Sequence, residues 1–266
     1  MILRYFIHLA YKGTNYSGWQ RQENTADTIQ QIIEGKLSLI YKKKVTAYGC
    51  GRTDAGVHAS QYVLHIDLDE APSLDLKFLL NKNLPEDIAV YAVLEVADDQ
   101  HSRYDASSRT YDYFVHWKKD PFLIGYSALY DDLSLDFDLM REAVALLSST
   151  KDFRPLCKQP DLYNNTLCKI TNCALFVDEQ RGRLRFTITS NRFLRGMVRL
   201  CVSFLLQVGT RKISLEKFSQ LLRQEIELNH KRPALPNGLF LSRITYPFLE
   251  LEESSKLIKM LKLGLE

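Results

Sequence analysis

The spacing of apolar residues along the first part of the chain predicts strands and helices in alternation. Short apolar segments that predict strands lie at residues 3–11, 45–48, 61–68 and 88–96. Residues 28–41 predict a helix, because apolar side chains recur there at helical spacing: Ile29, Ile32, Ile33, Leu37 and Ile40. Residues 73–84 predict a second helix, with Ser73 as its cap and with Leu74, Phe78 and Leu79 pointing inward. The order β-α-β-β-α-β is that of a ferredoxin-like unit, with both helices on one face of an antiparallel sheet and the other face free.

The same order of elements returns after Asp98 and Asp99. Residues 109–117 alternate in polarity as a strand does, and Asp136 is placed to cap a helix over residues 137–148. Further strands are predicted at residues 167–177, 184–190 and 240–246, and further helices at 195–208, 214–223 and 252–263. We therefore predict an α+β protein of two ferredoxin-like halves, residues 1–105 and 106–266, whose antiparallel sheets join around a basic cleft.

The composition is that of an ordinary soluble protein. Hydrophobic residues make up 45% and charged residues 25% of the chain. No apolar run reaches the ~18 residues that span a bilayer, and the first ten residues show no signal-peptide cleavage site, so we expect no membrane association. The five cysteines form no C-x-x-C pair, which favours reduced thiols in a cytoplasmic protein over a zinc site or a disulfide framework.

Charge is distributed unevenly along a chain whose net charge is only +3. Residues 1–60 hold eight basic and four acidic side chains, and residues 151–215 hold twelve and four. The acidic excess lies mainly between these two blocks. A basic face on a nearly neutral protein suggests a polyanionic partner, nucleic acid first, although either basic run could equally be solvated surface.

The loop between the strands at 45–48 and 61–68 carries the best candidates for chemistry. It is rich in glycine and contains Arg52, Asp54 and His58. In extended backbone Arg52 and Asp54 project from the same face, and a neighbouring guanidinium keeps a carboxylate ionised and oriented. Asp54 is therefore a candidate nucleophile or base, although these residue types also occur in plain turns and Asp54 could be a cap. His58 is expected to form a hydrogen bond that stabilises the loop.

Two residues of the second half are further candidates, each with a structural alternative. Tyr111, in the strand at 109–117, could stack on a nucleobase or pack in the core with Tyr113 on the same face. Arg199, one helical turn from Arg195, could pair with a carboxylate across the domain boundary or face solvent. Trp19 is expected to fill the core. No phosphate-binding or dinucleotide-binding motif is present, so no nucleotide cofactor is indicated.

Five motifs, in order and over nearly the whole chain, resemble those of the tRNA pseudouridine synthase A family. They are Y-K-G-T with G-W-Q at residues 11–20, G-R-T-D-A-G-V-H-A at 51–59, R-Y-D-A with R-T-Y-D-Y at 103–113, F-L-R-G-M-V-R at 193–199, and L-P-N-G-L at 235–239. The second of these is close to diagnostic. The fold of that family, two ferredoxin-like halves facing a basic cleft, agrees with the repeat of elements.

The resemblance implies an isomerase that converts uridine to pseudouridine in the tRNA anticodon stem-loop, at positions 38, 39 and 40. Asp54 matches the nucleophile, Tyr111 the residue that stacks on the target uracil, and Arg52 a loop arginine that helps flip or hold the nucleotide. Arg199 matches the arginine that pairs with the catalytic Asp. The resemblance implies no metal, no cofactor and a homodimer. Whether Asp54 attacks C6 of the base or C1′ of the ribose stays open.

Some positions depart from the family pattern, and other functions remain to be weighed. Lys12, Ser203, Leu235 and residues 153–156 differ from the usual residues, and the last of these bears on how RNA is gripped. A non-catalytic RNA-binding protein is the alternative, since ferredoxin-like sheets with strand aromatics often bind RNA. A pure binder gains nothing from the Asp54 carboxylate, which repels RNA. A phosphate-metabolising enzyme is a third and weaker option.

Overall fold

The computed structural model describes residues 2–131, 134–228, 231–252 and 256–265, and the chain divides into two compact units. Unit 1 consists of Met1–Ser107 and Phe240–Ile258. Unit 2 consists of Ser108–Leu239 and Lys259–Glu266. Residues 240–258, which the sequence pattern assigns to the second half, thus cluster with the first.

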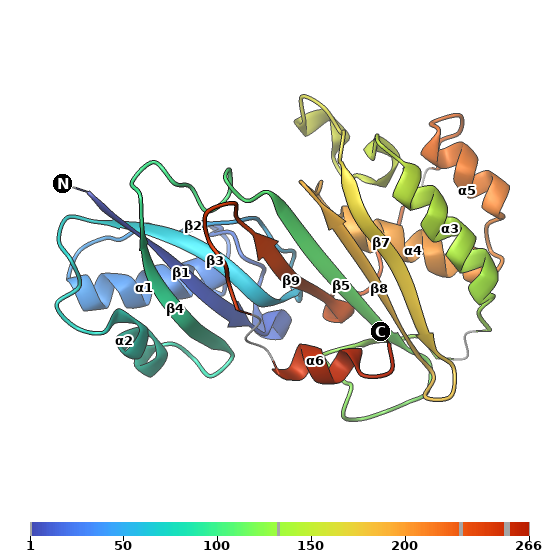
Figure 1. Cartoon of the computed structure of the whole chain (residues 1–266). Coiled ribbons are helices and arrows are strands. Elements are labelled where there is room, and N and C mark those ends of the chain that lie inside the picture. The colour runs from blue at the N-terminus through green and yellow to red at the C-terminus, as the bar shows by residue number, and fades with distance from the viewer. Residues whose placement is uncertain (1, 132–133, 229–230, 253–255, 266) are drawn as a thin grey trace. The chain divides into compact units, whose positions relative to one another are not determined.

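Unit 1 has the ferredoxin-like order of elements. These are β1 (Leu3–Tyr11), α1 (Ile29–Tyr41), β2 (Tyr48–Gly49), β3 (His58–Leu68), α2 (Leu76–Asn83) and β4 (Ile88–Val96). The strands lie in the order β4-β1-β3, with each neighbouring pair antiparallel, and the short β2 pairs antiparallel with β3. Helices α1 and α2 cover one side of this sheet (Figure 1). The predicted α+β class is therefore confirmed, although the strand predicted at 45–48 is reduced to two residues.

A strand from the end of the chain extends the sheet of unit 1. This is β9 (Leu239–Thr245), of which all but the first residue belong to unit 1. It runs parallel to β3, pairing Phe240 with His58 and Leu241 with Ala59. The buried Gln61 side chain adds to the ladder, because its Oε1 accepts a hydrogen bond from the Ile244 amide at 2.7 Å. These contacts explain why residues 240–258 group with unit 1.

Side chains cap the helices of both units at their N-termini. Thr28 accepts a hydrogen bond from the Gln31 amide at the start of α1, and Asp136 and Ser214 cap helices of unit 2 in the same way. Each such cap stabilises a helix by about 1 kcal/mol. For α2 the predicted cap is wrong, because Asp75 accepts the hydrogen bond from the Phe78 amide and the helix begins at Leu76.

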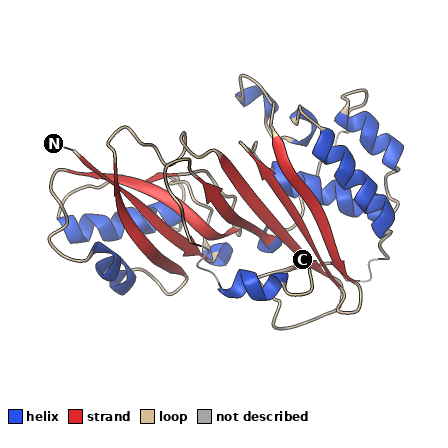
Figure 2. Cartoon of the chain, in the orientation of Figure 1, coloured by secondary structure: helices blue, strands red, loops and turns tan. Residues whose placement is uncertain are grey.

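Unit 2 has the β-α-β-β-α part of this order together with additional elements, while the last strand, β9, groups with unit 1. Its elements are β5 (Ser108–His116), β6 (Ala128–Leu129), α3 (Phe137–Ser149), β7 (Ile170–Asp178), β8 (Arg183–Ser190), α4 (Met197–Gly209), α5 (Leu215–Leu222) and the last four residues of α6 (Lys256–Lys262), whose first three belong to unit 1. The strands lie in the order β5-β8-β7 and both pairs are antiparallel, while β6 runs parallel to β5. Helices α3, α4 and α5 lie on one side of this sheet (Figure 2). Residues 253–255 of the predicted terminal helix fall outside the described residues.

The second face of each sheet is covered in part, contrary to the prediction that it is free. In unit 1, the buried Phe6 contacts the rings of Tyr246 and Phe248, with centroids 5.4 and 6.0 Å away. In unit 2, the carboxylate of Asp112 is 1% exposed and lies 3.4 Å from Nζ of Lys262 in α6. The prediction fails because segments after residue 240 return to these faces.

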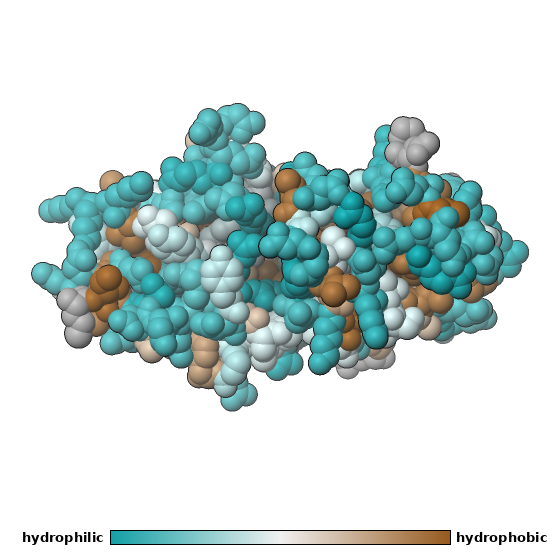
Figure 3. Space-filling view, turned by 90° about the horizontal axis from the view of Figure 1, so that it is seen from above, coloured by the Kyte–Doolittle hydropathy of each residue, from teal (hydrophilic) through white to brown (hydrophobic). Residues whose placement is uncertain are grey.

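The visible surface is mostly hydrophilic, and hydrophobic residues form separate patches on it (Figure 3). Among the described residues, no helix combines the length and the apolar character that crossing a bilayer requires.

Candidate active site

Asp54 lies in the loop of unit 1 that leads from β2 into β3. The Val57 amide donates a hydrogen bond to the Asp54 carbonyl across 3.2 Å, which closes a turn just before the strand begins at His58. Gly56 adopts a φ of +76° within this turn, a conformation that other residues rarely take. The Asp54 side chain is partly exposed. The backbone that carries the Asp54 carboxylate is thus held in a tight turn.

A second loop, residues 12–20, lies against this turn and fixes its backbone. The Trp19 amide donates a hydrogen bond to the Thr53 carbonyl at 3.2 Å. Gly18 adopts a φ of +92°, and a Cβ atom placed there would lie 2.5 Å from the Thr53 oxygen. Only glycine allows so close an approach of the two chains. Gly18 therefore lets the first loop support the residue directly before Asp54.

Aromatic side chains form the floor beneath both loops. The rings of Trp19 and Tyr62 stack with centroids 4.2 Å apart, and both side chains are buried. The Tyr62 hydroxyl donates a hydrogen bond to the Gly51 carbonyl, and the hydroxyl groups of Tyr11 and Thr53 lie 2.8 Å apart. Trp19 is thus a core residue, as predicted. Both ends of the segment 51–53 are tied to this aromatic floor.

His58 stabilises the loop, as predicted. Its Nδ1 atom accepts a hydrogen bond from the Gly13 amide at 3.0 Å, and its ring lies 4.6 Å from that of Phe240. A nitrogen that accepts from a backbone N–H carries no proton, so the second nitrogen carries it in the neutral ring. The side chain is 1% exposed. His58 thereby links the 12–20 loop to the first residue of β3.

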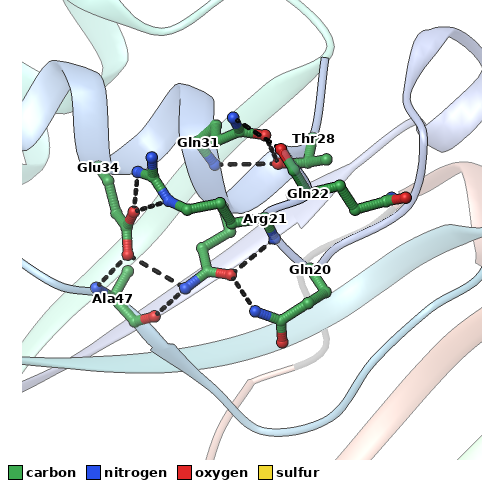
Figure 4. Close-up of polar contacts among 8 residues, drawn as sticks. Gln20, Arg21, Gln22, Thr28, Gln31, Glu34 and Ala47 are labelled. Carbon is green, nitrogen blue, oxygen red and sulfur yellow. Dashed lines mark hydrogen bonds and ion pairs between the residues drawn. The ribbon is translucent and has the colours of Figure 1, made fainter. Parts of the chain in front are cut away.

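The guanidinium of Arg52 is oriented by a neighbouring amide side chain. Its Nε donates a hydrogen bond to Oε1 of Gln20 at 3.0 Å, and the residue is exposed. Gln20 is in turn held by helix α1 (Figure 4). Sequence reasoning missed Gln20 as a partner, because the two residues are 32 positions apart and no local pattern joins them.

Tyr111 occupies the first half of β5 in unit 2. Its ring meets that of Phe193 edge-to-face, with centroids 4.9 Å apart, and the residue is partly exposed. Tyr113 on the same face is fully buried, and its hydroxyl donates a hydrogen bond to the Leu235 carbonyl at 2.7 Å. Burial raises the pKa of the Tyr113 hydroxyl well above its usual range. Of these two tyrosines, Tyr113 is a core residue, whereas Tyr111 is partly exposed to solvent.

Arg199 projects from α4 toward the segment that precedes the last strand. Its Nε donates a hydrogen bond to the Ala234 carbonyl at 2.7 Å, while the Ala234 amide donates to the Arg199 carbonyl at 3.0 Å. The residue is partly buried rather than open to solvent. Arg195, predicted on the same helix, precedes it, because α4 begins at Met197 after Gly196 with a φ of +72°.

Four residues of unit 2 form a basic cluster beside Phe193, namely Lys158, Tyr163, Arg192 and Arg195. The Arg192 guanidinium lies 5.7 Å from the centre of the Tyr163 ring, and the Arg195 amide donates a hydrogen bond to the Tyr163 hydroxyl. The Lys158 amide donates to the Arg195 carbonyl. The neighbouring acid Asp161 is paired with Arg154. The basic block of the sequence signals these charges, but only the fold shows that the residues carrying them lie around Tyr163 and the Arg195 backbone.

The four predicted site residues are divided between the units. Arg52 and Asp54 lie in one loop of unit 1, while Tyr111 and Arg199 lie in unit 2. In the part of the chain that the structure describes, no group of three or more His, Cys, Asp or Glu side chains is arranged to hold a metal ion.

Comparison with known proteins identifies relatives that match most of the chain. The family model described as tRNA pseudouridine synthase matches residues 8–105 and 143–247. The chain is 42% identical over 247 residues to tRNA pseudouridine synthase A of Porphyromonas gingivalis, covering 92% of this chain and 97% of the relative. The enzymes of the same name from Bacteroides fragilis and Streptococcus sanguinis are 40% and 36% identical, over 92% and 91% of this chain and 97% and 98% of theirs.

The family-model match spans both units and includes the loop of Asp54 and the helix of Arg199, whereas the strand of Tyr111 lies between its two matched segments. The resemblance seen in the sequence motifs is confirmed. The chain belongs to the tRNA pseudouridine synthase family, whose members are isomerases that convert uridine to pseudouridine.

Proposed function

We propose that this chain isomerises uridine to pseudouridine in the anticodon stem-loop of tRNA, at positions 38, 39 and 40, with Asp54 as the nucleophile. The observation that carries the proposal is a carboxylate on a loop that is fixed at the residues on both sides of it. The Trp19 amide and the Tyr11 hydroxyl hold Thr53, while the Val57 amide closes the turn after Asp54. The matching relatives are named tRNA pseudouridine synthase A, which supports tRNA as the substrate.

The reaction changes the attachment of one base without gain or loss of atoms. The bond between C1′ and N1 breaks, a bond between C1′ and C5 forms, the proton leaves C5, and N1 gains a proton. A carboxylate can assist by adding to C6 of the base or to C1′ of the ribose and leaving again. Either atom is out of reach in a base-paired stack, so the uridine must be everted from the RNA.

The other predicted site residues are proposed to bind the everted nucleotide or to act on the catalytic carboxylate. Tyr111 stacks on the target uracil, which suits a partly exposed ring held edge-on by Phe193. Arg52 helps to hold the nucleotide in its everted position, which suits an exposed guanidinium that is already oriented by Gln20. Arg199 balances the charge of the catalytic carboxylate.

The basic cluster of unit 2 suits the RNA backbone. Its guanidinium groups and ammonium group can neutralise phosphates, while Tyr163 offers a ring face to a base. Arg192 and Arg195 flank Phe193, the residue whose ring contacts Tyr111. A phosphate held there would lie close to a nucleotide stacked on Tyr111.

The decisive experiment maps pseudouridine in tRNA after incubation with the wild-type protein and with Asp54→Asn. We expect wild-type protein to modify the anticodon stem-loop, and the variant to bind RNA with similar affinity but leave uridine unchanged. Turnover at the wild-type rate in the variant would show that Asp54 is not the nucleophile. Binding by wild type without any pseudouridine would favour the alternative, a non-catalytic RNA-binding protein.

We propose in addition that the chain acts in the cytoplasm as a homodimer. The five cysteines all lie in the described part of the chain, none forms a disulfide and four are buried, which suits a reducing compartment. The dimer is expected from the family resemblance. Light scattering of the purified protein checks it, with a mass of twice 30.8 kDa as the expected result and a monomer mass as the contrary one.

A further inference from the structure

A network of hydrogen bonds in unit 1 runs from a buried carboxylate to the exposed guanidinium of Arg52. It begins at Glu34 on α1, whose side chain is 8% exposed, and passes through Gln30 and Gln20 (Figure 4). It ends at Arg52, 3.0 Å from the oxygen of Gln20. Nothing in the proposed reaction uses Glu34, Gln30 or Gln20 directly.

Glu34 anchors the base of this network with both of its oxygens. Oε1 accepts hydrogen bonds from the Ala47 amide at 3.0 Å and from Nε2 of Gln30 at 3.1 Å. Oε2 accepts a hydrogen bond from Nε of Arg21, also at 3.0 Å. A buried carboxylate that accepts hydrogen bonds from three different residues is fixed in position.

The contacts of Gln30 leave its amide only one orientation. Its Nε2 lies 3.1 Å from both the Ala47 carbonyl and Glu34 Oε1, and these two groups can only accept hydrogen bonds. The nitrogen must therefore face them. The Gln30 oxygen consequently faces the other way, where it accepts from the Arg21 amide and from Gln20, each at 2.9 Å.

The same reasoning fixes Gln20. Because Gln30 presents its oxygen, Gln20 must present its NH₂ group to it, and the Gln20 oxygen is then directed at Arg52. The Arg52 guanidinium can only donate hydrogen bonds, so it meets the Gln20 oxygen as a donor meets an acceptor. Glu34 thus determines, through two amide groups, that Arg52 meets an acceptor on this side.

We propose that Glu34, Gln30 and Gln20 are positioning residues that hold the Arg52 guanidinium in the orientation in which it meets the everted nucleotide. The proposal rests on the proposed function, in which Arg52 contacts the substrate. A flexible, exposed arginine loses rotamer freedom when it binds a ligand, and a partner that orients it beforehand lowers this cost. The expected loss on breaking the network is therefore in turnover and substrate binding, transmitted through Arg52.

A purely structural role is the competing explanation, since the network also ties α1 to the 20–22 segment and to Ala47. The two explanations differ in how mutations combine. A positioning residue loses its effect once Arg52 is gone, whereas a structural residue keeps it.

The test is a double-mutant cycle of Gln20→Met and Arg52→Ala, measured as kcat/KM for pseudouridine formation in anticodon stem-loop RNA. Gln20→Met keeps the side-chain length and removes both hydrogen-bonding groups. We expect each single variant to lower kcat/KM by about tenfold, and Gln20→Met to cause less than about a twofold further loss in the Arg52→Ala background. Gln30→Met is expected to behave like Gln20→Met.

Gln31→Met provides a matched control on the same helix. Gln31 accepts a hydrogen bond from the Thr28 hydroxyl and stands outside the network, so its replacement should leave kcat/KM within about twofold of wild type. Multiplicative losses for Gln20→Met and Arg52→Ala would overturn the positioning role. Full activity in Arg52→Ala would remove the role of Arg52 itself, and a wild-type protein without activity would refute the proposed function.

Discussion

The hydroxyl groups of Tyr11 and Thr53 lie 2.8 Å apart in a buried hydrogen bond, one residue before Asp54. Thr53→Val keeps the shape of the side chain and removes this bond. We expect unfolding free energy to fall by about 1–2 kcal/mol, since a buried hydroxyl partner is lost, and kcat to fall several-fold because the loop relaxes. Urea unfolding and single-turnover assays measure the two effects.

The control for this prediction is Thr150→Val. Its hydroxyl donates a hydrogen bond to the Leu146 carbonyl at the end of α3, in unit 2. We expect this variant to lose stability without loss of kcat. An equal fall in kcat for both variants would mean that general destabilisation, rather than the support of Asp54, causes the effect.

Gly18→Ala should disturb the loop that carries Asp54. The new Cβ would lie 2.5 Å from the Thr53 carbonyl oxygen, at a φ of +92° that alanine rarely adopts. We expect a loss of about 2 kcal/mol or more in stability, together with a lower kcat. Thermal unfolding and kinetics of the same preparation check both.

Gly35→Ala is the matched control for Gly18→Ala. Gly35 lies within α1, and apart from its chain neighbours and the backbone of its own helix, no heavy atom of the described residues lies within 4 Å of a Cβ placed there. Alanine favours a helix interior over glycine by about 0.5–1 kcal/mol, so this variant should be as stable as wild type or more stable. A comparable loss in both variants would show that the close approach at Gly18 is not the cause.

Acid should destabilise the protein before its carboxylates titrate, because of His8. Burial lowers the pKa of His8 from 6.5 to about 4, and His65 is lowered to about 4 in the same way. Below pH 6.5 the unfolded chain binds protons that the folded chain does not, so stability falls between pH 6.5 and about pH 4. We expect each histidine to contribute a loss of about 2–3 kcal/mol over this range.

The variant His8→Leu tests how much of the acid-induced loss of stability is due to His8. Within the described chain, Nε2 of His8 is buried without a hydrogen-bond partner, so leucine can replace it without breaking one. Urea unfolding at several pH values should show a shallower acid slope in the variant, while stability near pH 7 is maintained or increased. Parallel slopes for variant and wild type would contradict the assignment.

The basic cluster predicts a specific effect on RNA binding. Lys158→Ala combined with Arg192→Ala should raise KM about tenfold with little change in kcat, and should make binding less dependent on salt. Arg141→Ala is the control, because Arg141 is an exposed arginine on α3 that pairs with Asp138. If the control raised KM as much, net charge rather than this cluster would attract the RNA.

The main elements follow from the sequence because their signals are local. Thr28, Asp136 and Ser214 cap the helices that the apolar spacing predicts. In and just before α2, two different sets of apolar residues recur at helical spacing, and either set could face the sheet. Leu76 and Leu80 are buried, whereas Leu74 and Phe78 are exposed at 65% and 57%, contrary to the prediction. Spacing alone cannot choose between equivalent sets, since the choice depends on where the sheet lies.

The parts of the site that sequence reasoning misses are those built from distant segments. Arg52 and Asp54 stand out because the loop motif contains both. Gln20 belongs to the G-W-Q motif, but that motif gives it no role, and Gln30 is an ordinary amide in the sequence. Their place in the site follows from the contacts that bring α1, the 12–20 loop and the loop of Asp54 together. The location of β9 is likewise invisible to periodicity, because the pattern predicts a strand but not the neighbour with which it pairs.

The membership of β9 in unit 1 has a consequence for how the protein is made. A ribosome releases Met1–Ser107 long before it releases Phe240–Ile258, yet both belong to the same unit. Until translation is nearly finished, His58 and Ala59 lack the strand that pairs with them. The loop of Asp54 ends at that point of β3, so its final support arrives late, and a prematurely terminated chain lacks the strand that completes this support.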